Sequence, residues 1–145
     1  NEYMILQLAK KYKNLVILSA GLKMHTYCQS FSKFFPDRYF SFGLAEANVA
    51  SAAAGFALKG KLPLIVADKY FVGRAWEQIR NDICEPNLNV KIVVDGGELL
   101  AEADEVEEDL ALVAVLPNIE VFSIKGWDEK IFSKYGPAYV RLADI

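Results

Sequence analysis

The sequence has few of the residues from which metal and phosphate sites are usually built. His25 is the only histidine, and with no second histidine we predict no metal site. Neither a G-x-G-x-x-G nor a P-loop pattern occurs, so the chain has neither of these glycine-rich loops for cradling phosphates. Nothing near a serine or cysteine indicates a nucleophile paired with His25. Zinc chemistry and nucleotide-loop chemistry are therefore not expected.

Positive charge and long apolar runs are also missing. The formal net charge is −3, which gives no electrostatic footprint for nucleic acid or for an acidic membrane surface. No apolar run approaches the roughly 18–20 residues of a membrane span, and the first residues lack a signal-peptide pattern. Cys28 and Cys84 lie far apart, and we expect free thiols in a reducing cytoplasm, with a disulfide as the alternative. A cytoplasmic protein without nucleic-acid or membrane partners is expected.

The residues that are present indicate one globular domain. The 145 residues have the length of an ordinary domain, and 53% of them are hydrophobic, which is enough to fill one core. Internal repeats and proline- or serine-rich linkers are absent. We therefore expect a single domain over residues 1–145.

Helical and extended patterns alternate along the whole chain. The expected helices are Tyr3–Tyr12, Thr26–Phe35, Ala45–Leu58, Val72–Cys84, Glu105–Leu116 and Asp128–Tyr135. The expected strands are Asn14–Ala20, Arg38–Gly43, Leu62–Ala67, Asn89–Val94, Ile119–Ser123 and Pro137–Ala143. The strands are nearly continuous apolar runs, which is typical of strands covered by helices on both faces. The pattern predicts an α/β domain of three layers with a mostly parallel sheet of about six strands.

Glu46 is the first residue to suggest a site. It follows an expected strand and begins a helix built almost wholly of Ala, Gly and Ser, at the edge where parallel sheets bind ligands. The bland alternative is an ordinary first-turn acid that the helix dipole stabilises. The small residues behind Glu46 favour a second role, because they let another backbone or subunit approach closely.

Two further groups have both a functional and a structural interpretation. Tyr70 and Phe71 directly follow the third expected strand, with Arg74 one turn later, and could hold a flat ring or simply be core aromatics. Seven acids lie between Glu98 and Asp109. We interpret them as a solvated loop and helix start, with a divalent-cation site as the weaker alternative.

Long blocks of this sequence resemble the pyrimidine-binding domain of the transketolase family, which includes 1-deoxyxylulose-5-phosphate synthase. The blocks are "FPDR", "FGLAEAN" and "RAWEQIRNDICEPNLNVKIV", followed by "EEDLALVAVLPNIEVF" and a final "GPAYVRL". The likeness covers most of the chain. It implies the thiamine-diphosphate-binding fold, with the cofactor held between two domains from different chains.

The resemblance also implies roles for individual residues. Glu46 matches the acid that meets N1′ of the aminopyrimidine and exchanges a proton with it, which leads to deprotonation of the thiazolium C2. Phe71 matches the aromatic that stacks on the pyrimidine, and Tyr70 and Arg74 complete the expected cofactor-binding set. The small-residue helix matches a subunit interface, so a homodimer through this helix is expected.

Three departures from the family separate this chain from a complete enzyme. The "GDG…N" motif that holds Mg²⁺ and the diphosphate is absent, so a partner chain would have to supply it. The family's "T-H" pair is replaced by Ala103 and Asp104, and an acid after the first strand is replaced by Gly21. The matching part is only the middle domain of the family's three.

Two hypotheses follow for the function. In the first, the chain is one subunit of a split thiamine-diphosphate enzyme that transfers a ketol unit, inactive when alone. In the second, it is a degenerate, non-catalytic homodimer that binds a pyrimidine ligand or a protein partner. Intact Glu46 favours the first hypothesis, and the replaced histidine favours the second.

Overall fold

The computed structural model describes residues 2–21, 28–95, 108–125 and 128–143. The helices of this part are α1 (Glu2–Lys11), α3 (Gln29–Phe34), the short 3₁₀ helix η1 (Pro36–Arg38), α4 (Glu46–Leu58), α5 (Phe71–Gln78), the π-helix η2 (Ile79–Cys84), α6 (Glu108–Ala114) and α7 (Lys130–Ser133). The strands are β1 (Leu15–Ser19), β2 (Tyr39–Ser41), β3 (Leu62–Asp68), β4 (Lys91–Asp95), β5 (Glu120–Lys125) and β6 (Ala138–Ala143).

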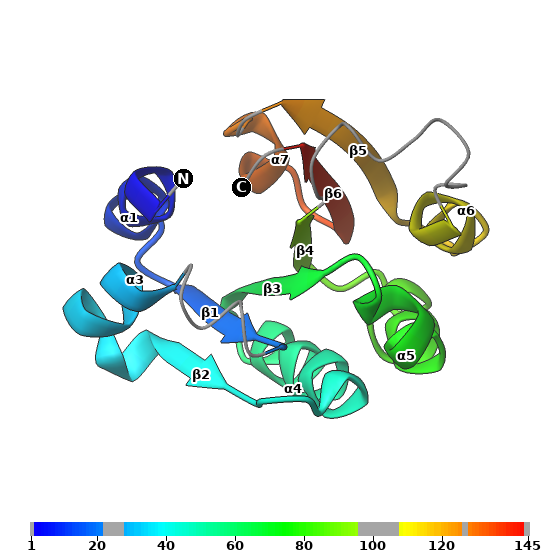
Figure 1. Ribbon diagram of the computed structural model, residues 1–145, viewed down its shortest axis with the longest axis horizontal. Helices are drawn as coiled ribbons and strands as arrows, with labels where there is room; N and C mark the ends of the chain where they lie inside the picture. The colour runs from blue at the N-terminus through cyan, green and yellow to red at the C-terminus, as the bar shows by residue number, and fades with distance from the viewer. Residues whose placement is uncertain (1, 22–27, 96–107, 126–127, 144–145) are drawn as a thin grey trace.

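The strands form one six-stranded sheet in the order β2-β1-β3-β4-β6-β5 (Figure 1). All of the pairings between these strands are parallel. Because the strands are parallel, their carboxyl ends share one edge, and the register places the ends of β3 and β4 side by side, with Asp68 opposite Asp95. The predicted α/β class and strand number are confirmed.

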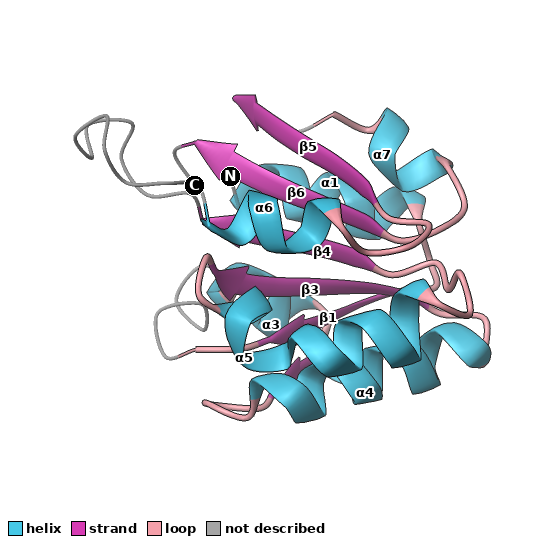
Figure 2. Ribbon diagram, turned by 90° about the vertical axis from the view of Figure 1, so that its right-hand side faces the viewer, coloured by secondary structure: helices cyan, strands magenta, loops and turns pink. Residues whose placement is uncertain are grey.

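Helices cover both faces of the sheet, so the domain has three layers, with the sheet in the middle (Figure 2). One face packs against α4, α5, η2 and α6, with residues such as Leu18, Ile65 and Ile92 in its core. The other face packs against α1, α3 and α7 around Leu64, Val93 and Val140. Successive residues along β3, and likewise along β4, thus point into opposite cores, such as Leu64 and Ile65. Both faces of these strands are buried, which explains why the strands are apolar without alternation.

The small residues of α4 divide between its two sides. Val49, Ala50, Ala53 and Ala54 are buried against the sheet and α5. The other side carries Asn48, Ser51 and Gly55, all exposed, and Ser51 Oγ donates a 2.7 Å hydrogen bond to Asp82 of η2. This side thus carries small and polar side chains, and a subunit contact over it stays a prediction.

The predicted helix over Val72–Cys84 is divided into two kinds of helix. Ala75 departs from helical backbone angles, and the chain continues as the π-helix η2 from Ile79. A π turn holds one residue more than an α turn, so Ile83 and Cys84 both lie about one turn beyond Ile79. All three side chains are fully buried, which shows how this short stretch delivers three apolar groups to the core.

Both cysteines are buried, and no disulfide joins them. Burial raises the pKa of the Cys84 thiol to about 12, so this thiol stays protonated near neutral pH. Within the described residues, the structure contains no helix with the length and apolar character needed to span a bilayer.

Lys91 is a buried cation at the start of β4. Its side chain is 1% exposed, and Nζ donates hydrogen bonds to the backbone carbonyls of Lys134 and Gly136, at 2.8 and 2.6 Å. Burial lowers the pKa of Lys91 from 10.5 to about 8. Lys91 therefore ties the connection between α7 and β6 to the amino-terminal edge of the sheet.

The lowered pKa of Lys91 predicts a stability that rises with pH. Between about pH 8 and 10.5 the unfolded chain binds the Lys91 proton more than the folded protein does. The free energy of unfolding should therefore rise through this window, by at most about 1.4 kcal/mol per pH unit from this group. Urea unfolding of wild type and Lys91→Met across this range measures the difference. Lys130→Met, which removes an exposed lysine, should keep the wild-type slope; equal slopes for all three proteins would contradict the prediction.

Candidate functional site

The carboxyl edge of the sheet brings together residues from two strand–helix connections. β2 leads through a tight turn to Glu46 at the start of α4, and β3 ends at Asp68 and leads through Tyr70 to α5. Gly43 has a φ of +60° in the first turn, and its carbonyl accepts a 2.7 Å hydrogen bond from the backbone N–H of Gly21. The two connections leave the same edge of the sheet, on either side of the end of β1, because β1 lies between β2 and β3 and pairs in parallel with both.

Glu46 is a nearly buried carboxylate with a single cationic partner among the contacts of the described residues. Arg74 Nη1 donates to Glu46 Oε1 at 2.6 Å. The Glu46 side chain is 11% exposed, whereas that of Arg74 is 55% exposed. The hydrogen bond and the charge of Glu46 raise the pKa of Arg74, and Asp68 adds to this in the same direction. Arg74 thus faces two acids, one of them shielded from water and one at the end of β3.

The two aromatic residues at this edge have different surroundings. Tyr70 is 61% exposed, and its backbone N–H donates to Asp68 Oδ1 at 3.0 Å. Phe71, the first residue of α5, is fully buried in the same core as the buried residues of α4. The interpretation of these residues as core aromatics therefore holds for Phe71 but not for Tyr70. The role of Phe71 in stacking on a ring stays a prediction, and Tyr70 is the aromatic side chain with the larger open surface.

A second polar cluster at the carboxyl edge escaped sequence reasoning. Asp109, in the first turn of α6, is 5% exposed and accepts hydrogen bonds from Tyr139 Oη at 2.7 Å and from Arg141 Nη1 at 3.1 Å. Burial, together with the bond to Asp109, raises the pKa of Tyr139. The interpretation of the 98–109 acids as solvated is therefore wrong for Asp109. The only sequence signal was the alternation of Tyr139 and Arg141 on one face of an otherwise apolar strand.

Several predicted features lie outside the described residues. These are His25, the replacement positions Ala103 and Asp104, and the acids of 98–107. The weak cation-site alternative for those acids and the role of Asp104 therefore stay predictions. Gly21, by contrast, is described: it has a φ of +95° and is bonded to the turn before α4, so it supports the local backbone of the Glu46 site.

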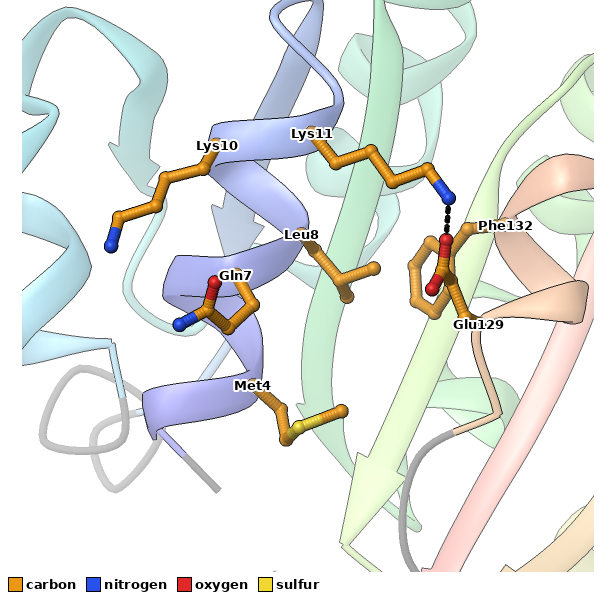
Figure 3. A pocket seen from close by; sticks show the side chains of 7 residues that line it. All are labelled: Met4, Gln7, Leu8, Lys10, Lys11, Glu129 and Phe132. Atoms are coloured by element: carbon orange, nitrogen blue, oxygen red, sulfur yellow. Dashed lines mark hydrogen bonds and ion pairs between the residues drawn. The ribbon is translucent and has the colours of Figure 1, made fainter.

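A cavity of about 390 Å³ lies on the other side of the sheet, between α1 and α7 (Figure 3). Leu8, Met4 and Phe132 give it an apolar wall, and an ion pair between Lys11 and Glu129 crosses one end. Its size would suit a small ligand. It is nevertheless separated from Glu46 by the sheet, because α1 and α7 belong to one face and α4 to the other.

Comparison with known proteins places this arrangement in one family. The profile of the transketolase pyrimidine-binding domain matches residues 2–125. The chain belongs to the transketolase pyrimidine-binding domain family. Glu46, Tyr70, Phe71 and Arg74 all lie within the matched range.

Individual relatives agree with the family assignment. The chain is 38% identical to a putative transketolase C-terminal section of Methanocaldococcus jannaschii, over 95% of this chain and 47% of that protein. It is 33% identical to the 1-deoxy-D-xylulose-5-phosphate synthase of Desulfotalea psychrophila, over 83% of this chain and 19% of that protein. The family is thus shown, and this chain spans half or less of these curated relatives.

Solved structures show the same domain. A split-gene transketolase, described as an inactive beta4 tetramer, superposes with a TM-score of 0.82 and 36% identity, over 98% of this chain and 50% of that chain. Transketolase from Campylobacter jejuni superposes with a TM-score of 0.73 over 92% of this chain and 23% of that one; at 18% identity it shows the fold alone. The fold and family are those of thiamine-diphosphate-dependent enzymes.

Proposed function

We propose that this chain supplies the pyrimidine half of a thiamine-diphosphate site, as one subunit of a split enzyme that transfers a ketol unit. The observation that carries the proposal is the shielded Glu46 carboxylate at the carboxyl edge, within a matched pyrimidine-binding domain. A carboxyl group that is 11% exposed can exchange a proton with a ring nitrogen away from bulk water. When bound, the cofactor supplies the nucleophilic carbon that attacks a carbonyl group.

The residues around Glu46 fit the aminopyrimidine end of that cofactor. Glu46 would hold or release a proton at N1′, and the exposed ring of Tyr70 offers an apolar surface beside it. Phe71 would support this surface from the core, and Arg74 would border the carboxylate. The fit rests on one carboxylate whose second oxygen lies outside the Arg74 bond and on one exposed aromatic ring at the same edge.

The diphosphate end of the cofactor would be bound by a separate chain. The sequence contains no "GDG…N" motif, and in our proposal the partner carries this motif and the Mg²⁺. The similarity to a split-gene transketolase supports a two-chain arrangement, and the description of that protein's tetramer as inactive supports our view that this chain is inactive alone. Half a cofactor site contributes few contact atoms, so affinity for the isolated chain should be low.

Recovery of the partner from the cells that make this chain tests the two-chain arrangement. A tagged chain should retain a protein that contains the "GDG…N" motif, identified by mass spectrometry. The purified pair should bind thiamine diphosphate with Mg²⁺ at least about a hundredfold more tightly than this chain alone, which corresponds to about 2.7 kcal/mol. Equal affinity of the pair and the single chain would contradict the proposal.

The alternative function is a non-catalytic homodimer that meets its second copy through α4. The exposed small residues Ser51 and Gly55 favour this contact, because small side chains let two helices approach closely. Sedimentation at micromolar concentration should then show a dimer that Gly55→Arg converts to monomer. Gly73→Arg, at another exposed helical glycine, should leave the dimer intact. A monomeric wild type would refute the contact.

A further inference from the structure

The bond between Arg74 and Glu46 occupies the group that the proposed function needs. At 2.6 Å it is a short, charge-assisted hydrogen bond, and it uses Oε1 of a carboxylate that is otherwise shielded. A guanidinium only donates hydrogen bonds, so Glu46 Oε1 serves Arg74 as an acceptor. A neutral aminopyrimidine presents N1′ as an acceptor, and it therefore requires a carboxyl group that carries a proton. Arg74 uses the Glu46 carboxyl group as an acceptor, whereas the ring would use it as a donor. The two contacts therefore compete, although the second oxygen lies outside the Arg74 bond.

Arg74 has a second acid within its electrostatic reach. Asp68 ends β3 and accepts a hydrogen bond from the backbone N–H of Tyr70 at 3.0 Å. The Tyr70 carbonyl in turn accepts one from the backbone N–H of Arg74 at 3.3 Å, so Asp68 lies next to the first turn of the helix that carries Arg74. Glu46 is the main cause that raises the pKa of Arg74, and the charge of Asp68 adds a smaller contribution in the same direction. The Arg74 side chain is 55% exposed, so it can change its position without disturbing the core. Lys69 and Tyr70 are the other titratable groups of this connection, and Lys69 Nζ lies over the Tyr70 ring, 5.4 Å from its centroid.

We infer that Arg74 is a two-position counterion that holds Glu46 in the isolated chain and transfers to Asp68 when an aminopyrimidine takes Glu46. This inference rests on the proposed function. Arg74 is then a positioning residue that acts through Glu46, and it keeps the single subunit silent by holding the Glu46 carboxyl group in its own hydrogen bond. Ligand binding must displace the Arg74 guanidinium from Glu46. Asp68 makes this displacement less costly, because the guanidinium then still has an acid as its partner.

The test is an NMR titration of the full chain with 4-amino-5-hydroxymethyl-2-methylpyrimidine at pH 7. Arg74→Met should lower the dissociation constant about three- to fivefold, because a partly exposed ion pair no longer competes. Asp68→Asn should raise it by a similar factor, since the displaced guanidinium loses its second partner. Asparagine keeps the oxygen that accepts the Tyr70 N–H, so the turn itself should be retained. In wild type, the carboxyl carbon resonance of Asp68 should move as the probe binds, and this movement should vanish in Arg74→Met.

Arg80→Met is the matched control, because it removes one positive charge from the same helical segment, where Arg80 pairs with Glu85 at 2.8 Å. It should bind the probe as wild type does. Weaker binding by Arg74→Met would overturn the inference and make Arg74 a direct ligand contact. The inference would also be overturned if either Arg74→Met or Asp68→Asn bound the probe as wild type does, or if neither wild type nor Arg74→Met bound it. In each of these cases the proposed function would still stand if the reconstituted pair of chains were active and lost its activity when Glu46 was replaced.

Discussion

Replacement of Glu46 by glutamine should lower the ketol-transfer rate of the reconstituted two-chain enzyme by about 10²- to 10⁴-fold, which is the usual contribution of a positioned acid or base. Glutamine has nearly the same size and keeps an oxygen that can accept the Arg74 hydrogen bond. It can neither hold nor release a proton at the position where N1′ would lie. The loss should therefore appear in kcat, and the chain should stay folded and associated with its partner.

Glu77→Gln is the matched control for this result. Glu77 is an exposed acid on α5, close in sequence to Arg74 but directed to solvent, and the same substitution there should leave the rate unchanged. Initial rates at saturating thiamine diphosphate and Mg²⁺ give the comparison, and thermal unfolding confirms that the variants are folded. If the two-chain enzyme kept full activity with Glu46→Gln, Glu46 would have no catalytic role.

Replacement of Asp109 by alanine should destabilise the folded chain by about 3–5 kcal/mol, the usual cost of removing one partner from a buried ion pair. The side chains of Asp109 and Arg141 are 4% and 16% exposed. Alanine would leave the Arg141 guanidinium without this partner and the buried Tyr139 hydroxyl without its acceptor. Because a domain of this kind has roughly 5–15 kcal/mol of total stability, the loss would be a large fraction of it.

Urea unfolding followed by circular dichroism measures this effect. Asp109→Asn keeps an acceptor oxygen but removes the charge, so it should cost about 1–3 kcal/mol and remain measurable if the alanine variant does not fold. Glu129→Ala breaks the ion pair with Lys11, in which both side chains are more than half exposed, and should cost less than about 1 kcal/mol. Equal losses for Asp109→Ala and Glu129→Ala would show that the Asp109 cluster contributes no more than a surface pair.

These two predictions concern different parts of one edge. Glu46 lies at the start of α4 and Asp109 at the start of α6, and both helices cover the same face of the sheet. The Asp109 cluster joins α6 to β6, whereas the Glu46 pair joins α4 to α5. We therefore expect Asp109 variants to change stability first, and Glu46 variants to change activity first.

Most of the architecture could be predicted from local patterns. Strand runs such as Leu62–Ala67 and Asn89–Val94 fall within two residues of β3 and β4. Glycine and proline mark the ends of several elements, and apolar periods distinguish helices from strands, so these boundaries depend on residues that are close in sequence. A mostly parallel sheet was expected because strands and helices alternate, and all of the pairings between the described strands are parallel. The π-helix was not predicted, since its geometry depends on what the core can accept around Ile83 and Cys84.

The candidate site was predictable only in part. Glu46 was selected as a candidate because a lone acid at a strand–helix connection stands out among small residues, and because the family resemblance implies a role for it. The separation of Tyr70 and Phe71 into one exposed and one buried ring was not visible, because neighbouring residues in a connection have no fixed period. The role of Asp109 was missed because an acid among seven acids has no local mark of burial.

The sequence by itself determined the fold class and the family, and it singled out Glu46 as the candidate carboxylate, since each depends on local pattern or on matched motifs. Only the tertiary structure decided the pairing of Glu46 with Arg74, 28 residues apart, and of Asp109 with Tyr139 and Arg141, 30 and 32 residues apart. Such pairs depend on which helix starts meet at the carboxyl edge and on which side chains lose water there. Burial and strand order set both, and neither is a property of any short stretch of the chain.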